Sequence, residues 1–234
     1  MRELRFAIKN TVPIFFTYLF IGIAYGVLMS GAGYSAALTA ASSLFIYAGS
    51  LQLTMVPLMK AGASLPSLAV LAFFINARHL FYGIGFIERF RTMGWRRPYM
   101  IFALTDETYS VLCNLRAEEG PDGQRAMFLI ALLDHLYWVL GSTAGALAGT
   151  FLPFDTRGIE FSATAFFLVV AVNQWRESRT RLPFLLAAAC ALVFLLLLGK
   201  ESFLIPTLTA CTLGLALLRG PVEKRLERRE RPDA

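Results

Sequence analysis

Three polar residues, Asn76, Arg78 and His79, lie near the middle of a long apolar segment, residues 66–87. The segment is about long enough to cross the hydrocarbon core of a bilayer as a helix. An arginine at the centre of such a helix costs roughly 2.5–3.5 kcal/mol on insertion scales, so a chain keeps it where a partner or a watery cavity receives the charge. The segment therefore predicts a functional site. The alternative is a buried arginine that a carboxylate neutralises merely to hold the helices together.

Helical spacing divides these residues between two sides of the segment. Tyr82 follows Arg78 by four residues and shares its side, whereas Asn76 and His79 lie on another. They do not form one catalytic face, and they could contact two neighbouring elements.

An interruption in the preceding apolar segment, residues 35–59, is the second candidate. Gly49 and Ser50 are followed by Gln52 and, further on, by Pro57. A helix that begins or ends within the membrane exposes backbone amides and carbonyls, which can bind the carboxylate or ammonium group of a zwitterion. A kink that glycine tolerates, with Gln52 bonded across helices, is the alternative.

Two adjacent carboxylates, Asp106 and Glu107, interrupt the apolar segment 98–115. They are natural counter-ions for Arg78 and candidates for a proton carrier. Adjacent residues point to different faces of a helix, so the two roles can be divided between them. The alternative places both acids at a solvated loop end.

Asp134 and His135 form a fourth polar step, inside the apolar segment 126–151. His135 could titrate near neutral pH. Asp134 lies on a stripe with Trp138 and Gly141 and is a candidate for substrate binding or coupling. A structural role near the interface is the alternative.

The motifs do not indicate an enzyme. No H-E-x-x-H motif is present, and the sequence around Ser50 is not the Gly-x-Ser-x-Gly of serine hydrolases. The three cysteines have neither the spacing of metal ligands nor that of a disulfide framework, and they are expected to be small buried hydrophobes. We expect no catalytic residues, no metal and no cofactor.

The composition indicates an all-α, polytopic helical membrane protein. Hydrophobic residues make up 56% of the 234 residues and charged residues 16%, against about 25% charged in ordinary globular domains. The net charge of +6 comes from basic residues in the loops and in the C-terminal tail. Such residues typically keep loops and tails on the cytoplasmic side, beside anionic lipid headgroups, and they do not indicate nucleic-acid binding. We expect one transport domain, residues 1–220, followed by a basic cytoplasmic tail, residues 221–234.

Charge also constrains the topology. The candidate membrane segments are residues 11–30, 35–59, 66–87, 98–115, 126–151, 159–175, 183–199 and 202–219. If all eight crossed and the N-terminus were cytoplasmic, the four arginines of loop 88–97 would lie outside, against the positive-inside rule. We therefore predict six full spans plus two broken or re-entrant segments, 35–59 and 98–115, with both termini cytoplasmic. Seven or eight crossings remain the alternative.

Small residues recur at a spacing that lets helix backbones approach closely. Gly141, Gly145 and Gly149 are four residues apart, and Gly22 and Gly26 repeat that spacing. The pattern predicts tight packing of two helices and no direct role in ligand binding.

Four motifs together resemble the AzlC family. They are Gly22-Ile-Ala-Tyr-Gly26, Ala48-Gly-Ser-Leu-Gln52, Asn76-Ala-Arg-His-Leu-Phe-Tyr82 and Thr105-Asp-Glu-Thr-Tyr109. The second half of the chain is less similar: Glu160-Phe161 stands where many members have Asp-Phe, and Asn173-Gln174 replaces a more apolar stretch.

The resemblance implies the large subunit of a branched-chain amino acid exporter in the cytoplasmic membrane. It implies Val, Leu and Ile as substrates, with Met as a further candidate. It also implies a small AzlD-type membrane subunit as partner, and proton coupling in place of ATP hydrolysis. The chain has no Walker A loop, which agrees with this expectation. A passive channel or a membrane scaffold that transports nothing is the alternative.

Overall fold

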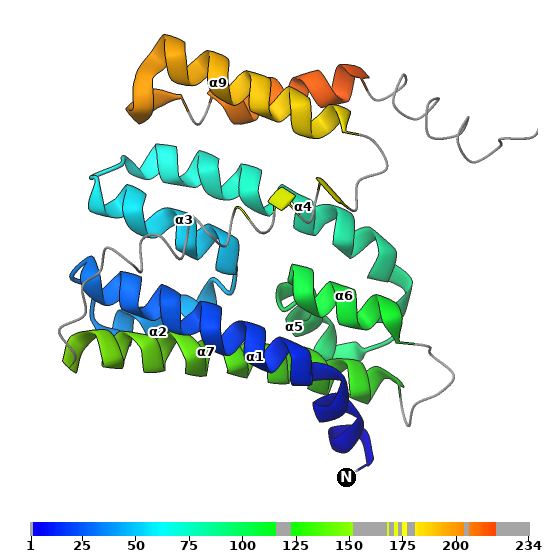
Figure 1. The fold of residues 1–234 in the computed structure, drawn as a ribbon. Coiled ribbons are helices and arrows are strands. Elements are labelled where there is room, and N and C mark those ends of the chain that lie inside the picture. The colour runs from blue at the N-terminus through cyan, green and yellow to red at the C-terminus, as the bar shows by residue number, and fades with distance from the viewer. Residues whose placement is uncertain are drawn as a thin grey trace, which may run out of the picture. The chain divides into compact units, whose positions relative to one another are not determined.

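A computed structural model describes most of the chain as helix (Figure 1). The described residues are 2–115, 123–151, 168, 171–172, 175–176, 181–203 and 206–218. Contacts divide the chain into two compact units, residues 1–163 and 164–234, which are described separately. The prediction of a single domain over residues 1–220 stays a prediction.

Four of the described helices are long and apolar enough to cross a membrane. They are α1 (Arg2–Gly31), α4 (Leu65–Arg91), α7 (Gly123–Phe151) and α9 (Leu182–Ser202). The predicted class, an all-α membrane protein, is confirmed. The predicted span 159–175 and the basic tail lie almost wholly outside the described residues, so the count of six spans stays a prediction.

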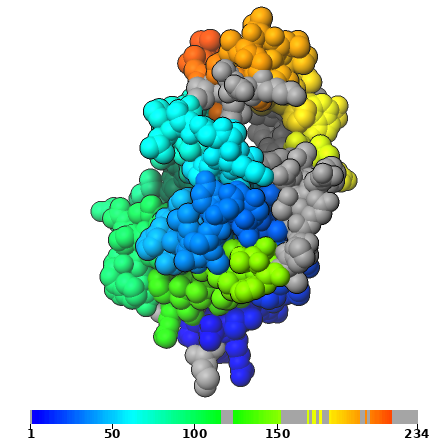
Figure 2. Space-filling model, turned by 90° about the vertical axis from the view of Figure 1, so that its left-hand side faces the viewer, coloured from blue at the N-terminus to red at the C-terminus, as the bar shows by residue number. Residues whose placement is uncertain are grey.

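Helices α1 and α7 run in the same direction and form the core of the first unit. Their contacts progress together, because Tyr18 lies against Trp138 and, further along both helices, Ser30 lies against Thr150. Figure 2 shows the green end of α7 beside the blue segments of α1 and α2. The predicted glycine packing is confirmed, because a Cβ at Gly26 would overlap the backbone of α7.

This packing predicts that Gly26→Ala destabilises the protein. The new Cβ would overlap backbone atoms of Ser142 and Ala146, which cannot move aside without separating the helices. We expect the midpoint of thermal unfolding in detergent to fall by several degrees. Gly83→Ala in α4 is the matched control, because nothing lies within 4 Å of that position. Equal midpoints for both variants would contradict the packing.

The first interrupted segment is a helical hairpin. Helix α2 (Ala36–Phe45) runs back along α1, and α3 (Gly49–Lys60) then folds back along α2. The reversal is seen in Gln52, whose side-chain nitrogen lies 3.5 Å from the Ser43 hydroxyl of α2. At the tip, Tyr47 has a left-handed backbone with φ of 44°, which is uncommon for a residue other than glycine.

The second interrupted segment is also a hairpin. Helix α5 (Arg97–Phe102), preceded by the short 3₁₀ helix η1 (Gly94–Arg96), runs inward, and α6 (Asp106–Asn114) returns. Thr105 begins α6 as its N-cap, and its hydroxyl accepts a hydrogen bond from the backbone N–H of Thr108. Both interruptions predicted from the sequence are confirmed, and each segment folds back on itself.

The two hairpins enter the unit from opposite ends. The α2–α3 hairpin opens at the end where α1 finishes and α4 begins, and the α5–α6 hairpin opens where α4 finishes and α7 begins. Their tips meet in the middle, where Tyr18 contacts both Tyr47 and Thr105. If the long helices cross a bilayer, each hairpin enters and leaves on one side, as expected for re-entrant segments.

Basic residues gather at one end of this unit. The start of α7 meets the α4–α5 connection, since the Gln124 side chain donates to the Thr92 hydroxyl at 2.8 Å. The α1 N-terminus lies at the same end, because α1 runs parallel to α7. The basic residues there are Arg2, Arg5, Lys9, Arg89, Arg91, Arg96, Arg97 and Arg125. Among the described residues of the opposite end, Lys60 carries the positive charge.

The second unit contains α9 and a helix over residues 206–218. Gly199 interrupts α9 with a φ of 73°, and Gly214 packs against Leu186. Cys190 and Cys211 in this unit and Cys113 in the first are free thiols. Cys113 is exposed and the other two are only half-buried in the isolated chain, so the expectation of buried cysteines is wrong.

Candidate functional site

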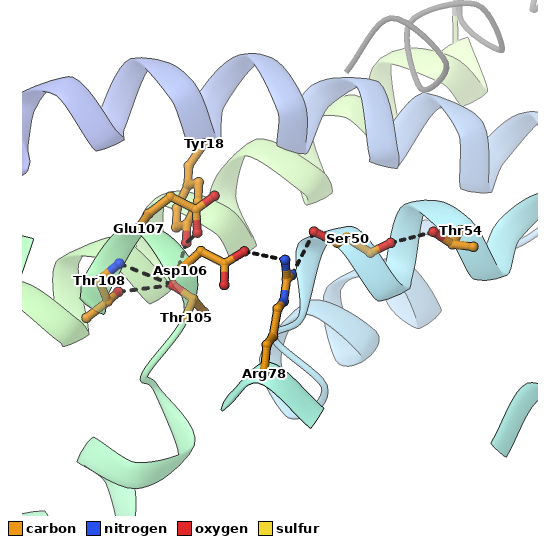
Figure 3. A network of polar contacts seen from close by, with 8 residues as sticks. All are labelled: Tyr18, Ser50, Thr54, Arg78, Thr105, Asp106, Glu107 and Thr108. Carbon is orange, nitrogen blue, oxygen red and sulfur yellow. Dashed lines mark hydrogen bonds and ion pairs between the residues drawn. The ribbon is translucent and has the colours of Figure 1, made fainter. Parts of the chain in front are cut away.

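Arg78 lies between the tips of the two hairpins (Figure 3). One terminal nitrogen of its guanidinium is 2.7 Å from Oδ2 of Asp106, at the start of α6. The other donates to the hydroxyl of Ser50, at the start of α3, at 2.9 Å. The predicted ion pair between Arg78 and Asp106 is therefore present in the structure, and one side chain of α4 joins both hairpins.

The starts of α3 and α6 differ in how they are capped. Thr105 caps α6 with its side chain, whereas Ala48, at the corresponding position before α3, makes no side-chain cap. The first N–H groups of a helix have no partner within the helix, and together they carry a partial positive charge. The uncapped start of α3 beside Arg78 is thus suited to a carboxylate.

The ion pair is only partly enclosed and has unused hydrogen-bonding groups. The side chains of Arg78 and Asp106 are 36% and 33% exposed, so a small molecule can reach them. Nε of Arg78 and Oδ1 of Asp106 are nevertheless buried and have no hydrogen-bond partner among the described residues. Oδ1 of Asn76, two residues before Arg78, is likewise buried and has no hydrogen-bond partner among the described residues. Buried polar groups are ordinarily paired, so these atoms are available to a ligand.

A second polar group extends from Glu107 to Asp134. The Tyr18 hydroxyl lies 2.8 Å from a Glu107 carboxylate oxygen and 2.8 Å from the Thr105 hydroxyl. Thr105 lies 3.2 Å from Thr108, whose hydroxyl is 2.9 Å from Oδ2 of Asp134. Asp134 is fully buried on α7 and makes no ion pair with a described basic residue. In the described structure Asp134 is therefore not a partner of Arg78.

His135 serves the packing of the same region. Its ring lies 4.2 Å from the ring of Tyr47, stacked on it, and Nδ1 is 3.0 Å from the Tyr99 hydroxyl. Nε2 lies 3.3 Å from the backbone oxygen of Ser43. These contacts connect α7 to both hairpins.

The other residues predicted for the site have different surroundings. Gln52 is buried and accepts a hydrogen bond from the Trp138 indole N–H at 3.0 Å, and Gly49 packs on the same indole. These two contacts hold the α3 hairpin to α7. Tyr82 lies near Asp106 and stacks on Tyr109, with ring centres 4.5 Å apart.

His79 is half-buried, with its ring 5.9 Å from that of Tyr82 and tilted to it. It makes no hydrogen bond with Arg78 or Asp106 in the described structure. Its role at the site stays a prediction.

Several residues of the site were not predicted from the sequence. Tyr18 and Tyr47 connect the tips, Ser43 bonds Ser142 of α7 at 2.7 Å, and Trp138 is buried in the core. Tyrosine and serine are common in helical segments, so residue type alone could not identify them. The small-residue spacing of α1 could have indicated that Tyr18, one turn before Gly22, faces α7.

Comparison with known proteins covers the part of the chain that holds the site. A family model described as "AzlC protein" matches residues 13–152. The branched-chain amino acid transport protein AzlC of Bacillus subtilis is 35% identical over 94% of this chain and 87% of its own length. An uncharacterized membrane protein of Helicobacter pylori J99 is 37% identical over 95% of this chain and 98% of its own length. The inner membrane protein YgaZ of Escherichia coli is 26% identical over 74% of this chain and 73% of its own length. No solved structure matches.

Proposed function

Because this chain belongs to the AzlC family of membrane transport proteins, we propose that it exports branched-chain amino acids as the large subunit of a two-component secondary transporter. Val, Leu and Ile are the proposed substrates, with Met as a weaker one. The observation that carries the proposal is the partly exposed Arg78–Asp106 pair at the uncapped start of α3.

A zwitterion is complementary to this pair when the pair opens. The substrate carboxylate takes the place of Oδ2 of Asp106 on Arg78 and lies against the free N–H groups at the start of α3. The substrate ammonium group then pairs with the released Asp106. Charge is balanced before and after the exchange, so no unpaired ion is left inside the membrane.

The substrate side chain adds little discrimination of its own. A hydrophobic pocket distinguishes single methylene groups by only about 1–3 kcal/mol. We therefore propose overlapping export of Val, Leu, Ile and Met, and exclusion of amino acids with a charged side chain, whose extra charge has no partner at the pair.

The orientation of the protein in the membrane and the energy source of export are also part of the proposal. The basic end of the first unit is proposed to face the cytoplasm, in accord with the positive-inside rule. Proton entry is proposed to drive export, since a second carboxylate, that of Glu107, adjoins Asp106 of the ion pair. A small AzlD-type membrane subunit is the proposed partner.

Efflux measurements test this proposal. Cells that lack their own exporters are loaded with leucine-containing dipeptides, and the release of labelled leucine is followed with this chain alone, with the small subunit, and with both. We expect saturable release only when both are present, faster at acidic external pH, with glutamate and lysine as controls that are not released. Full release by this chain alone would contradict the two-subunit arrangement. Release that neither saturates nor responds to pH would indicate a passive channel instead.

A further inference from the structure

A continuous line of hydroxyl groups joins two carboxyl groups inside the first unit. Glu107 is connected through Tyr18, Thr105 and Thr108 to Asp134, by contacts of 2.8, 2.8, 3.2 and 2.9 Å. The members come from three helices, α1, α6 and α7, and from the tip before α6. All four contacts lie within or near the usual range of hydrogen bonds between oxygens.

The number of hydrogens in this line is informative. Four hydrogen bonds need four hydrogens, and the three hydroxyls supply one each. Ionised carboxylates only accept hydrogen bonds, so with both acids ionised one of the four contacts has no hydrogen. A single proton on either carboxyl completes the line. If Glu107 holds it, every hydroxyl donates toward Asp134. If Asp134 holds it, every hydroxyl donates toward Glu107.

Burial also requires a proton on this line. Asp134 is 0% exposed, and no described basic side chain forms an ion pair with it. An unpaired carboxylate in a low-dielectric interior is so costly that such groups bind a proton instead. Asp106, which is paired with Arg78, does not face this cost. The two neighbouring acids of α6 therefore differ: one balances Arg78 and the other belongs to the hydroxyl line.

We propose that Glu107 and Asp134 share one transferable proton through Tyr18, Thr105 and Thr108, and that this line is the proton-coupling path of the transporter. The proposal rests on the proposed function and names the residues of its coupling step. It assigns Asp106 to substrate exchange and Asp134 to proton binding, at two separate places in the unit.

The transfer balances in atoms and charge. In one direction the O–H bond of Glu107 breaks and its proton passes to Tyr18, while the hydroxyl protons of Tyr18, Thr105 and Thr108 each move one place along. A new O–H bond forms on Asp134. Four O–H bonds break and four form, and no oxidant or other reactant is needed.

The two ends of the line have different surroundings. Glu107 is half-buried beside the partly exposed ion pair, so it can exchange a proton with that space, whereas Asp134 is closed off. The other titratable or charged groups that face the line from the neighbouring elements are Tyr47, Arg78, Tyr99, Asp106 and His135.

Removing one hydroxyl tests the path. Tyr18→Phe deletes the link between Glu107 and Thr105 with no change in ring size. Tyr25→Phe is the matched control, because Tyr25 is a buried tyrosine on the same helix whose hydroxyl bonds Ser42, outside the line. With both subunits in proteoliposomes, two rates are measured: net leucine efflux driven by a pH gradient, and leucine exchange at equal pH and equal concentration, which needs no net proton movement.

We expect Tyr18→Phe to lower gradient-driven efflux at least 10-fold while exchange stays within twofold of wild type, and Tyr25→Phe to leave both rates within twofold. Gradient-driven efflux by Tyr18→Phe at the rate of the control overturns the path. So does an equal loss of exchange and efflux at normal protein abundance, because that result places Tyr18 in substrate binding.

Infrared spectroscopy tests the shared proton without any transport. The purified full-length protein should show a carbonyl band from a buried protonated carboxyl group near neutral pH. Asp134→Asn and Glu107→Gln should each abolish the band, since either amide completes the line with its own N–H. A band that survives in Glu107→Gln shows that the two acids bind protons independently, and it overturns the proposal. If wild type releases no branched-chain amino acid, the proposed function fails while this measurement still decides on the shared proton.

Discussion

Replacing Arg78 with alanine is expected to reduce leucine export at least 100-fold while the protein still reaches the membrane. The guanidinium supplies two hydrogen bonds, to Asp106 and Ser50, and in the proposed exchange it holds the substrate carboxylate. Hydrogen bonds to charged groups contribute about 1.5–3 kcal/mol each, which is roughly 10- to 100-fold in binding for each bond lost. The loss should appear in leucine binding to the purified complex as well as in efflux.

Two further substitutions separate charge from geometry at this position. Arg78→Lys keeps the positive charge but offers a single point of contact, so it cannot bond Asp106 and Ser50 in the same fork. We expect its export to lie between those of wild type and Arg78→Ala. Arg89→Ala is the matched control, because Arg89 is on the same helix, near its end, with a 3.5 Å contact to a backbone oxygen of α6. Export by Arg78→Ala equal to that of this control would refute the site.

Asp106→Asn is expected to lower export far more than it changes binding. In the proposed exchange, Asp106 competes with the substrate carboxylate for Arg78. The amide competes poorly with a carboxylate for the guanidinium, which favours the substrate, but it also pairs poorly with the substrate ammonium group, so leucine binding should change little. Export should still fall at least 100-fold, because nothing then displaces the substrate from Arg78 on the way out.

This split between binding and export distinguishes exchange from simple charge balance. If Asp106 only neutralises Arg78, its loss should weaken folding and binding together, because an unpaired cation is left behind. Asp106→Glu is a useful companion, since it keeps the charge and lengthens the side chain, and it should recover part of the export. Binding by isothermal titration and efflux from the same preparations provide the two readouts. An equal loss of binding and export in Asp106→Asn would contradict the exchange.

The Arg78–Asp106 pair could be predicted from the sequence because a charge in an apolar segment needs a partner. The chain has few acids within its apolar segments, so the candidates for Arg78 were few. The two helix interruptions could also be predicted, since Gly49 and Asp106 mark where each returning helix begins. Both inferences depend only on local residue type and on the high cost of polar and charged groups inside a membrane.

The hydroxyl line could not be predicted in the same way. Tyr18, Thr105 and Asp134 are far apart in the sequence, and nothing in their types distinguishes them from other residues that can be buried in helices. They meet because α1 and α7 pack closely at glycines, and because the start of α6 contacts both of these helices. Gln52 shows the same limit, because the structure bonds it to Trp138 of α7 while its place in the site stays a prediction. Its polarity was visible, but its partner on α7 was not.

The entry of the two hairpins from opposite ends has a consequence for how the protein could change shape. Residues 2–60 and 65–114 show the same order of elements, a long helix followed by a hairpin of two short ones, but they run in opposite directions. In transporters built from inverted repeats, such halves are related by a twofold axis in the membrane plane, and turning the unit over exchanges their roles. A conformation open to one side of the membrane then has a counterpart of similar energy open to the other. Arg78, which bonds the start of a helix in each half, would lie at their junction in either state.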